Sequence, residues 1–203
     1  MSAHASHDIV GIVLAAGRGR RFGGDKLRRA LPDGTPIGLA SARALRAALP
    51  GRVLAVVRFG ETNLRGEFEA DGIECVECTD ADSGMGASLA SGVRATDDAA
   101  GWLIALGDMP FVRTETVAAI TAALAGGARI AAPVHAGRRG HPVGFSADLR
   151  DELLALGGDE GARSVVARHR RDLVPIHCDD AGVLADIDTP ADLATALAVH
   201  GAG

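Results

Sequence analysis

Residues 17–29 have the composition of a loop that binds phosphates. The apolar run IVLAA ends there in a glycine-rich stretch with six basic residues and one acid, in a chain whose formal net charge is −5. Backbone amides and cationic side chains of such a loop can surround a polyphosphate. Arg21 and Lys26 are the expected cations. The alternative interpretation is a solvated basic turn.

Two well-known phosphate-binding motifs do not fit this loop. The dinucleotide fingerprint requires a glycine where Phe22 stands, and an acid after the second strand, where Arg58 stands. A P-loop requires Lys and then Ser or Thr directly after its last glycine, whereas Gly24 is followed by Asp25, Lys26 and a leucine. The loop therefore predicts polyphosphate binding by a different motif.

Acidic residues at two other places have the chemistry of a magnesium site. Asp108 in ALGDMP directly follows an apolar run, and Asp186 and Asp188 lie in ADIDTPADL. Carboxylate oxygens are suitable Mg²⁺ ligands, although an Asp before Pro is also typical of a turn. One of the pair is expected to complete the metal site and the other to cap the last helix. We favour Asp188 for the metal.

Three further segments are candidates for ligand contact. Gly86 and Ser88 in SGMGAS precede a predicted helix, where glycine permits close approach of a ring or ribose; the alternative is a glycine-rich turn with a serine cap. His141 follows two arginines and could face an anionic second substrate, or be structural. Arg163, near the start of another predicted helix, has the same two interpretations.

Composition excludes several classes of protein. The acidic balance and the single basic segment argue against nucleic-acid binding, and no apolar run approaches the ~18 residues of a membrane span. Three cysteines, an odd number, suggest a reducing compartment, by default the cytoplasm. Cys75 and Cys78 lie in a strand-like run, where a spacing of three places them on opposite faces, which argues against a zinc site.

Apolar runs rich in Val and Ile alternate along the chain with helical patterns. This alternation predicts an α/β fold with a mostly parallel sheet, which must position the candidate residues. Residues 1–203 are expected to form a single domain, with 1–8 as a disordered leader. The loops after the first, third and fourth strands should converge at the carboxyl edge of the sheet. Strands are predicted at 9–16, 52–58, 73–78, 102–107, 129–134, 141–146 and 172–177. Helices are predicted at 35–49, 61–70, 88–96, 113–125, 148–156, 161–169 and 189–199.

Six motifs in order resemble one known family. LAAGRGRRFGGDK is similar to the signature LAAGxSxRMGxxK of the MobA-like nucleotidyltransferases, with Phe22 for the usual methionine and Gly19 for the usual serine. Five further motifs follow in the same order as in the molybdenum cofactor cytidylyltransferase branch: GMGASLASG, LGDMPFV, GRRGHPVGF, GDEGAR and DIDTPADL. The resemblance covers about residues 9–199. Within that family Ala16, in LAAG as against LAGG, implies CTP over GTP.

The resemblance implies a three-layer Rossmann-like nucleotidyltransferase fold and transfer of CMP from CTP, with Mg²⁺ (or Mn²⁺), to the phosphate of a molybdopterin-type cofactor. It implies Lys26, Arg21 and Asp108 as catalytic residues, Asp108 and Asp188 as metal ligands, and His141 and Arg163 as acceptor contacts. A molybdenum enzyme or its maturation factor is an expected partner. The implied nucleotide contacts are Leu14, Ala15, Ala16, Gly17, Arg18, Gly19, Gly23, Lys26, Gly86 and Ser88.

Two other functions remain open from the sequence. Some relatives of this branch are nicotine blue oxidoreductases, which use NAD(P)H, and the loop with Gly17, Gly19 and Arg58 could accept such a dinucleotide. The third hypothesis is a nucleotide-binding cofactor chaperone without turnover.

Overall fold

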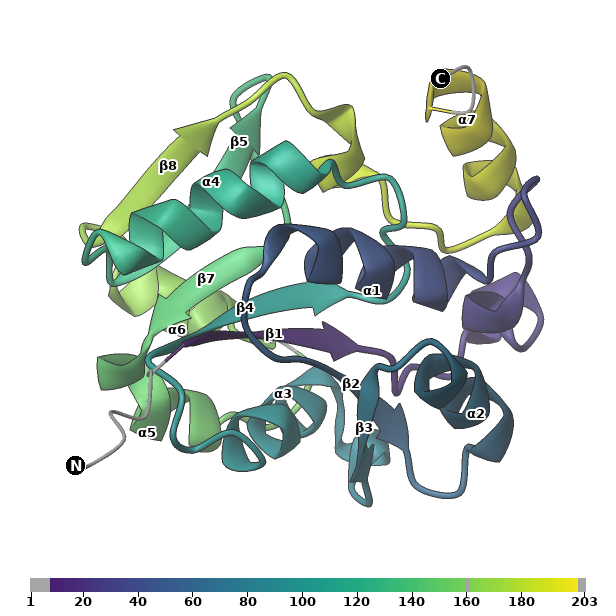
Figure 1. Ribbon diagram of the computed structural model, residues 1–203, viewed down its shortest axis with the longest axis horizontal. Helices are drawn as coiled ribbons and strands as arrows, with labels where there is room; N and C mark the ends of the chain where they lie inside the picture. Colours follow the sequence, from purple (N-terminus) through teal and green to yellow (C-terminus); the bar gives the residue numbers. More distant parts are fainter. Residues whose placement is uncertain (1–7, 160, 201–203) are drawn as a thin grey trace.

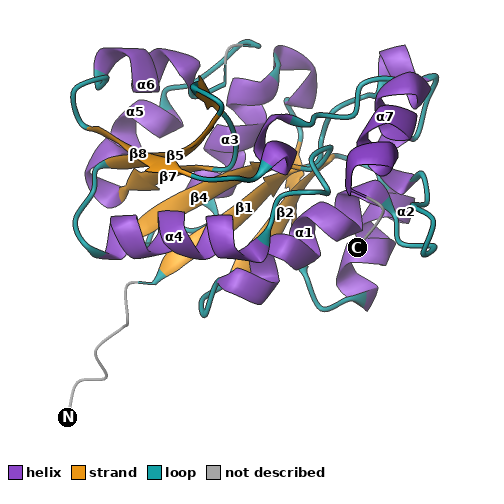
Figure 2. Cartoon of the chain, turned by 90° about the horizontal axis from the view of Figure 1, so that it is seen from above, coloured by secondary structure: helices purple, strands orange, loops and turns teal. Residues whose placement is uncertain are grey.

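The computed structural model describes residues 8–159 and 161–200. The leader predicted at 1–8 lies outside these residues except for its last member. One sheet of eight strands crosses the described part of the chain, and helices cover both of its faces (Figure 1, Figure 2). The predicted α/β fold with a central sheet between helices is confirmed.

Every predicted strand and helix is present, with ends that differ by at most three residues. The structure adds a two-residue strand, β6. The strands are β1 (Ile9–Leu14), β2 (Val53–Arg58), β3 (Glu74–Cys78), β4 (Gly101–Leu106), β5 (Ile130–His135), β6 (Arg138–Arg139), β7 (Val143–Ser146) and β8 (Leu173–His177). The α-helices are α1 (Ile37–Ala48), α2 (Thr62–Ala70), α3 (Met85–Arg94), α4 (Thr114–Ala125), α5 (Arg150–Leu154), α6 (Arg163–Arg168) and α7 (Pro190–His200).

The sheet is mostly parallel, as predicted, with one reversed strand in its middle. The order is β3-β2-β1-β4-β7-β5-β6, and β8 pairs with β5. Pairs among β1, β2, β3 and β4 are parallel, as is β5 with β8, whereas β7 is antiparallel to both β4 and β5. The carboxyl ends of β1 to β4 therefore meet at one edge of the sheet.

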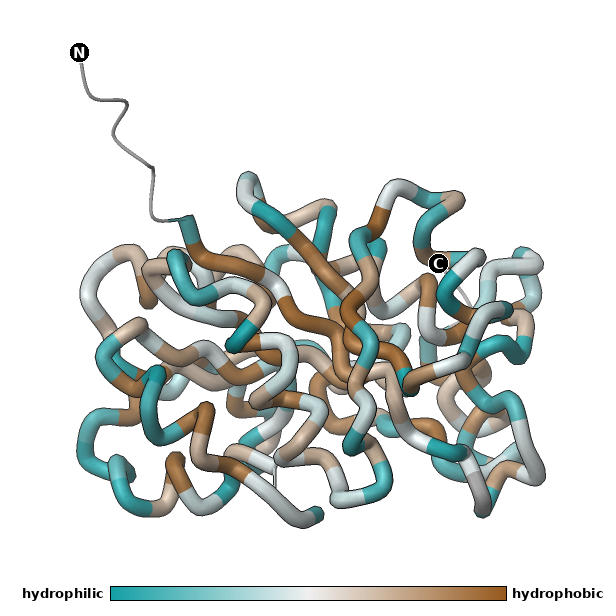
Figure 3. Tube along the Cα trace, turned by 90° about the horizontal axis from the view of Figure 1, so that it is seen from below, coloured by the Kyte–Doolittle hydropathy of each residue, from teal (hydrophilic) through white to brown (hydrophobic). Residues whose placement is uncertain are grey.

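Alternation along the strands builds a core on each side of the sheet. In β1, Ile12 and Val13 are both fully buried, but Ile12 faces the core under α3, α5 and α6, and Val13 faces the one under α1, α2 and α4. Figure 3 shows these hydrophobic stretches running through the middle of the molecule. With both faces covered, the strands position the loops at the edge rigidly.

The two cysteines of β3 lie on opposite faces, as their spacing predicts. Cys78 is buried in one core, and Cys75 packs against the other, where burial raises its pKa to about 11. Both are free thiols, as is Cys178. Among the described helices, none is long and apolar enough to cross a membrane.

Candidate functional site

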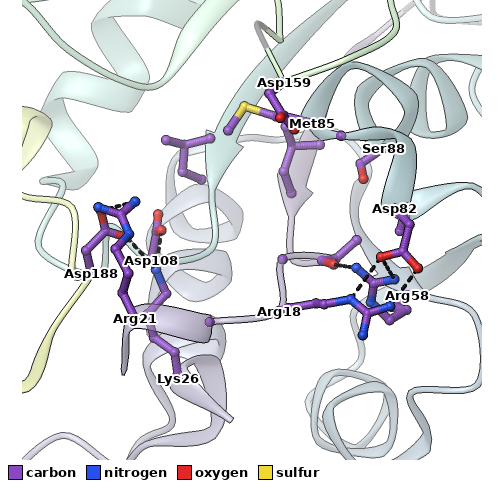
Figure 4. Close-up of a pocket in the computed structure, with 17 residues that line it drawn as sticks. Arg18, Arg21, Lys26, Arg58, Asp82, Met85, Ser88, Asp108, Asp159 and Asp188 are labelled. Carbon is purple, nitrogen blue, oxygen red and sulfur yellow. Dashed lines mark hydrogen bonds and ion pairs between the residues drawn. The ribbon is translucent and has the colours of Figure 1, made fainter. Parts of the chain in front are cut away.

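A cavity of about 530 Å³ opens beyond the carboxyl ends of β1, β2 and β4 (Figure 4). It will be called the first cavity. It is lined by residues of the loops after β1, β3 and β4, which the sequence predicted to converge. Its lining residues are Leu14, Ala16, Gly17, Arg18, Gly19, Arg21, Lys26, Arg58, Ala81, Asp82, Gly84, Met85, Ser88, Leu106, Asp108, Asp159 and Asp188.

The Lys26 ammonium lies between two carboxylates at one side of the first cavity (Figure 4). Its Nζ donates to Asp108 Oδ2 over 2.8 Å and to Asp188 Oδ1 over 3.1 Å. Arg21 Nη2 lies 2.9 Å from the other oxygen of Asp188. Burial lowers the pKa of Lys26, but the ion pairs outweigh this effect and hold its pKa above the ordinary value. Two cations and two carboxylates thus meet at one place.

Local packing explains why these two cations face the cavity. Phe22 packs against the core and Leu27 is buried in it, and each lies in a 3-10 helix, Arg20–Phe22 and Lys26–Arg28. Successive side chains in such a helix are about 120° apart, so the residue before each of them leaves the core. Gly19 has φ of +57°, and a Cβ there would lie 3.0 Å from Cβ of Lys26. Glycine thus accommodates both the positive φ and the close approach where the loop turns back past Lys26.

Backbone hydrogen bonds bring Asp188 to Asp108. The amide of Ile187, a fully buried residue, donates to the carbonyl of Asp108 over 3.0 Å. The segment before it is held by Asp180, whose buried carboxylate accepts from Arg113 N, Thr116 Oγ1 and Gly182 N over 2.7 to 3.0 Å. This carboxylate acts as an external cap on α4, whose N-cap residue Arg113 has no capping side chain: it holds the Arg113 amide and the Thr116 hydroxyl.

The two acids of the DID segment have different surroundings. Asp188 faces the first cavity, whereas Asp186 lines a second cavity described below. Neither caps the last helix, contrary to prediction. Thr189 and Asp192 form a reciprocal capping box instead: Asp192 N donates to Thr189 Oγ1, and Thr189 N donates to Asp192 Oδ2.

Asp108 and Asp188 fit a divalent metal that is shared with a ligand. Asp108 Oδ1 is buried without a hydrogen-bond partner in the structure, and its second oxygen is held only by the exchangeable ammonium of Lys26. No group of three or more His, Cys, Asp or Glu in the described residues could hold a metal. Two carboxylates completed by substrate phosphates are a usual Mg²⁺ environment.

Asp82, which was not predicted as a site residue, forms a charged group with Arg18 and Arg58 at the opposite side of the first cavity (Figure 4). Arg18 donates to both Asp82 oxygens and Arg58 donates to one, over 2.6 to 2.9 Å. The hydrogen bond from Arg18, followed by that from Arg58, lowers the pKa of Asp82 to about 2. The sequence could have indicated this group, because Arg58 ends β2 and Asp82 follows β3, which places both at the same edge of the sheet.

The start of α3 differs from the prediction. The helix begins at Met85, so Gly86 and Ser88 lie in its first turn, not before it. Ser88 lines the first cavity, but Gly86 does not: a Cβ there would lie 2.7 Å from the backbone of Gly157. The space expected for a ring or ribose at Gly86 is filled by the chain itself.

Two other predicted nucleotide contacts also lie outside the first cavity. Ala15 and Gly23 line a neighbouring hollow, which shares Gly17, Arg18, Lys26 and Arg58 with the first cavity.

The predicted acceptor contacts lie together in a second cavity of about 370 Å³. His141 and Arg163 line it with Arg138, Arg139 and Asp186 over an apolar floor. Burial, and then the charge of Arg139, lowers the pKa of His141 to about 4, so the imidazole is neutral. The second cavity shares four lining residues with the first, namely Leu14, Met85, Leu106 and Asp159. Ligands in the two cavities would therefore be neighbours.

Residues 11–173 match the family model for the MobA-like NTP transferase domain. A molybdenum cofactor guanylyltransferase of Cupriavidus necator is 33% identical over 94% of this chain and 97% of its own length. The purine catabolism protein PucB of Bacillus subtilis is 31% identical over 91% and 93%. A nicotine blue oxidoreductase of Paenarthrobacter nicotinovorans is 28% identical over 89% and 92%.

Among solved structures, Rv0371c of Mycobacterium tuberculosis H37Rv in complex with manganese is 28% identical to this chain. The two superpose with a TM-score of 0.78, over 94% of this chain and 98% of the other.

Proposed function

Because the chain belongs to the MobA-like NTP transferase family, we propose that it transfers CMP from CTP to the phosphate of a molybdopterin-type cofactor, in the cytoplasm. The nucleotide binds in the first cavity and the acceptor in the second. The proposal rests on one observation: Lys26 contacts both Asp108 and Asp188 at the side of the first cavity, which shares lining residues with the second cavity.

The reaction requires positioning and charge neutralisation more than a protein nucleophile. An oxygen of the acceptor phosphate attacks the α-phosphorus of CTP, and the bond to the bridging oxygen breaks, so pyrophosphate leaves. A phosphate monoester has its second pKa near 6, so the attacking group is already ionised at neutral pH. Consequently no side chain has to act as a base.

Lys26 and Arg21 would neutralise the phosphate oxygens of the nucleotide. Both already bind carboxylates and need only exchange these partners for phosphates. Asp108 and Asp188 would hold Mg²⁺ or Mn²⁺, which supplies further charge neutralisation when bound. The manganese complex of a related structure supports a divalent ion in this fold.

The choice of CTP rests on the sequence LAAG, in which Ala16 stands where the guanylyl branch has glycine. Leu14, the loop from Ala16 to Gly19 and Ser88 would contact the nucleotide, since all of them line the first cavity. Curated relatives include guanylyltransferases, which makes GTP the competing substrate that any test must contain.

The second cavity suits an anionic acceptor with an apolar or planar body. Arg163 would bind the acceptor phosphate, assisted by the neighbouring Arg138 and Arg139. His141, neutral and half-buried, would contribute a hydrogen bond and no charge. A molybdenum enzyme or its maturation factor would receive the product.

The experiment is pyrophosphate release from CTP, GTP or ATP, with Mg²⁺ and molybdopterin as the acceptor. We expect release with CTP to be fastest and to require both metal and acceptor. Equal or faster release with GTP would overturn the base assignment. Tight CTP binding without release would identify a nucleotide-binding chaperone instead.

A redox function is the second candidate, favoured by the nicotine blue oxidoreductase among the relatives and by two arginines in the first cavity. Arg18 and Arg58 could bind the 2′-phosphate of NADPH. Titration with NADPH, followed by its fluorescence, separates the two functions. Absence of binding at millimolar cofactor would exclude the redox candidate.

A further inference from the structure

Arg18, Asp82 and Arg58, called here the Arg–Asp–Arg cluster, lie across the first cavity from Lys26 (Figure 4). Each side chain comes from a different segment: Arg58 ends β2, Arg18 lies in the loop after β1 and Asp82 in the loop after β3. Ion pairs hold the three together, with a side-chain exposure of 25% for Arg58 and 64% for Asp82. The three side chains are therefore linked to one another and still open to a ligand.

The position of the Arg–Asp–Arg cluster indicates that it would contact the base end of a nucleotide. The proposed function places the polyphosphate at Lys26 and Arg21, beside the divalent ion that Asp108 and Asp188 would hold. The base then extends toward the opposite side of the cavity, where the Arg–Asp–Arg cluster lies. This step rests on the proposed function, because it assumes a nucleoside triphosphate in the first cavity.

The cluster offers a ligand more hydrogen-bond donors than acceptors. Asp82 accepts three N–H bonds from the two arginines, which occupy most of its lone-pair positions. A fourth bond joins Arg58 Nη2 to the carbonyl of Ala16 over 3.1 Å. Each guanidinium retains further N–H groups, whereas Asp82 has little acceptor capacity left.

Of cytosine, guanine and uracil, cytosine matches this balance. Its pairing edge has two acceptors, O2 and N3, beside one donor, the 4-amino group. Guanine presents two adjacent donors, N1–H and the 2-amino group, which would need a carboxylate with both oxygens free. Uracil has a carbonyl in place of the 4-amino group, and an ionised carboxylate repels it.

We infer that the Arg–Asp–Arg cluster selects the base, with Asp82 accepting from the 4-amino group of cytosine and the arginines donating to O2 and N3. Asp82 suits this role because its bonds to the arginines keep it ionised and fixed in place. Arg58 also fixes the carbonyl of Ala16, so the cluster and the LAAG segment act as one surface.

The test compares equilibrium binding of CTP, UTP and GTP, with Mg²⁺ and without acceptor, in the wild type and in Asp82→Asn. Cytosine and uracil have the same size, so their affinity ratio isolates the amino group. The wild type should bind CTP at least ~10-fold more tightly than UTP, the cost of an unmet hydrogen bond to a charged group. In Asp82→Asn, whose amide can also donate to a carbonyl, the ratio should fall to within ~3-fold.

Asp71→Asn is the matched control, since Asp71 also pairs with two arginines, Arg43 and Arg46, and lies outside both cavities. It should leave the CTP-to-UTP ratio unchanged. An unchanged ratio in Asp82→Asn, or tighter binding of GTP than of CTP by the wild type, would overturn the base assignment to this cluster. Absence of binding of any nucleotide to the wild type would instead overturn the proposed function, and this inference with it.

Discussion

The backbone amide of Ile187 donates to the carbonyl oxygen of Asp108 across 3.0 Å. This hydrogen bond places the next residue, Asp188, beside Asp108, so that Lys26 Nζ contacts both carboxylates. A segment near the end of the chain thereby completes a site that begins in the first loop. The proposed metal and nucleotide site depends on this arrangement.

Replacing Asp108 by Asn should reduce kcat at least ~100-fold, because the variant loses a carboxylate that would hold the divalent ion. The measurement is pyrophosphate release at saturating CTP, Mg²⁺ and acceptor, with Asp71→Asn as the control for loss of an arginine-paired aspartate. Turnover within a few fold of the wild type would remove Asp108 from the mechanism.

Replacing Lys26 by Gln should abolish most turnover and increase the stabilisation of the protein by Mg²⁺. Without the ammonium, Asp108 and Asp188 repel each other, so Mg²⁺ should raise Tm by more in this variant than in the wild type. Thermal unfolding with and without millimolar Mg²⁺, in the absence of nucleotide, measures the difference. Arg43→Gln, which removes a cation from the Asp71 pair, should show the wild-type response. The same response in Lys26→Gln would argue that the two aspartates do not form a metal site.

Asp180→Ala should destabilise the fold by about 2–4 kcal/mol, because three donors lose a buried acceptor at once. Urea unfolding followed by far-UV circular dichroism gives the change. The folded fraction should also lose activity, because the same carboxylate anchors the segment that leads to Asp188. Normal stability would show that the cap on α4 is dispensable.

Stability should fall as the pH is lowered below the ordinary pKa of histidine, because partial burial and the charge of Arg139 keep His141 neutral in the folded protein. Its folded pKa of about 4 lies below the unfolded value of 6.5. The unfolded state therefore binds more protons between these values, and the loss should reach about 2 kcal/mol near pH 5. Denaturant unfolding at several pH values from about 7.5 to 5 tests this, and His141→Gln should flatten the dependence. An equal slope in the variant would contradict the assignment.

Most of the fold follows from the sequence, and its exceptions have physical causes. Apolar runs and turn residues locate the strands to within a few residues, but they do not encode direction, so the reversal of β7 between β4 and β5 was not predicted. The start of α3 was missed because glycine is a poor helix former. Gly86 is helical all the same, since only glycine permits the contact with Gly157.

The candidate site, like the fold, could be predicted from the sequence only in part. Lys26, Arg21, Asp108 and Asp188 could be proposed because they sit in recognisable local motifs, and the structure brings them together. Whether Asp186 or Asp188 joins Asp108 depends on a long-range backbone hydrogen bond, and residue types carry no information on that register. Asp82 was missed because its significance lies in two arginines distant in sequence.

The most direct test of the central claim is a crystal structure with Mn²⁺ and a CTP analogue whose α,β-bridge cannot be cleaved. Anomalous scattering would locate the metal independently of the refined model. The account predicts a manganese peak within bonding distance of Asp108 and Asp188, with Lys26 moved from these carboxylates onto the phosphates. A peak bound elsewhere, with Lys26 still between the two aspartates and away from the nucleotide, would contradict it.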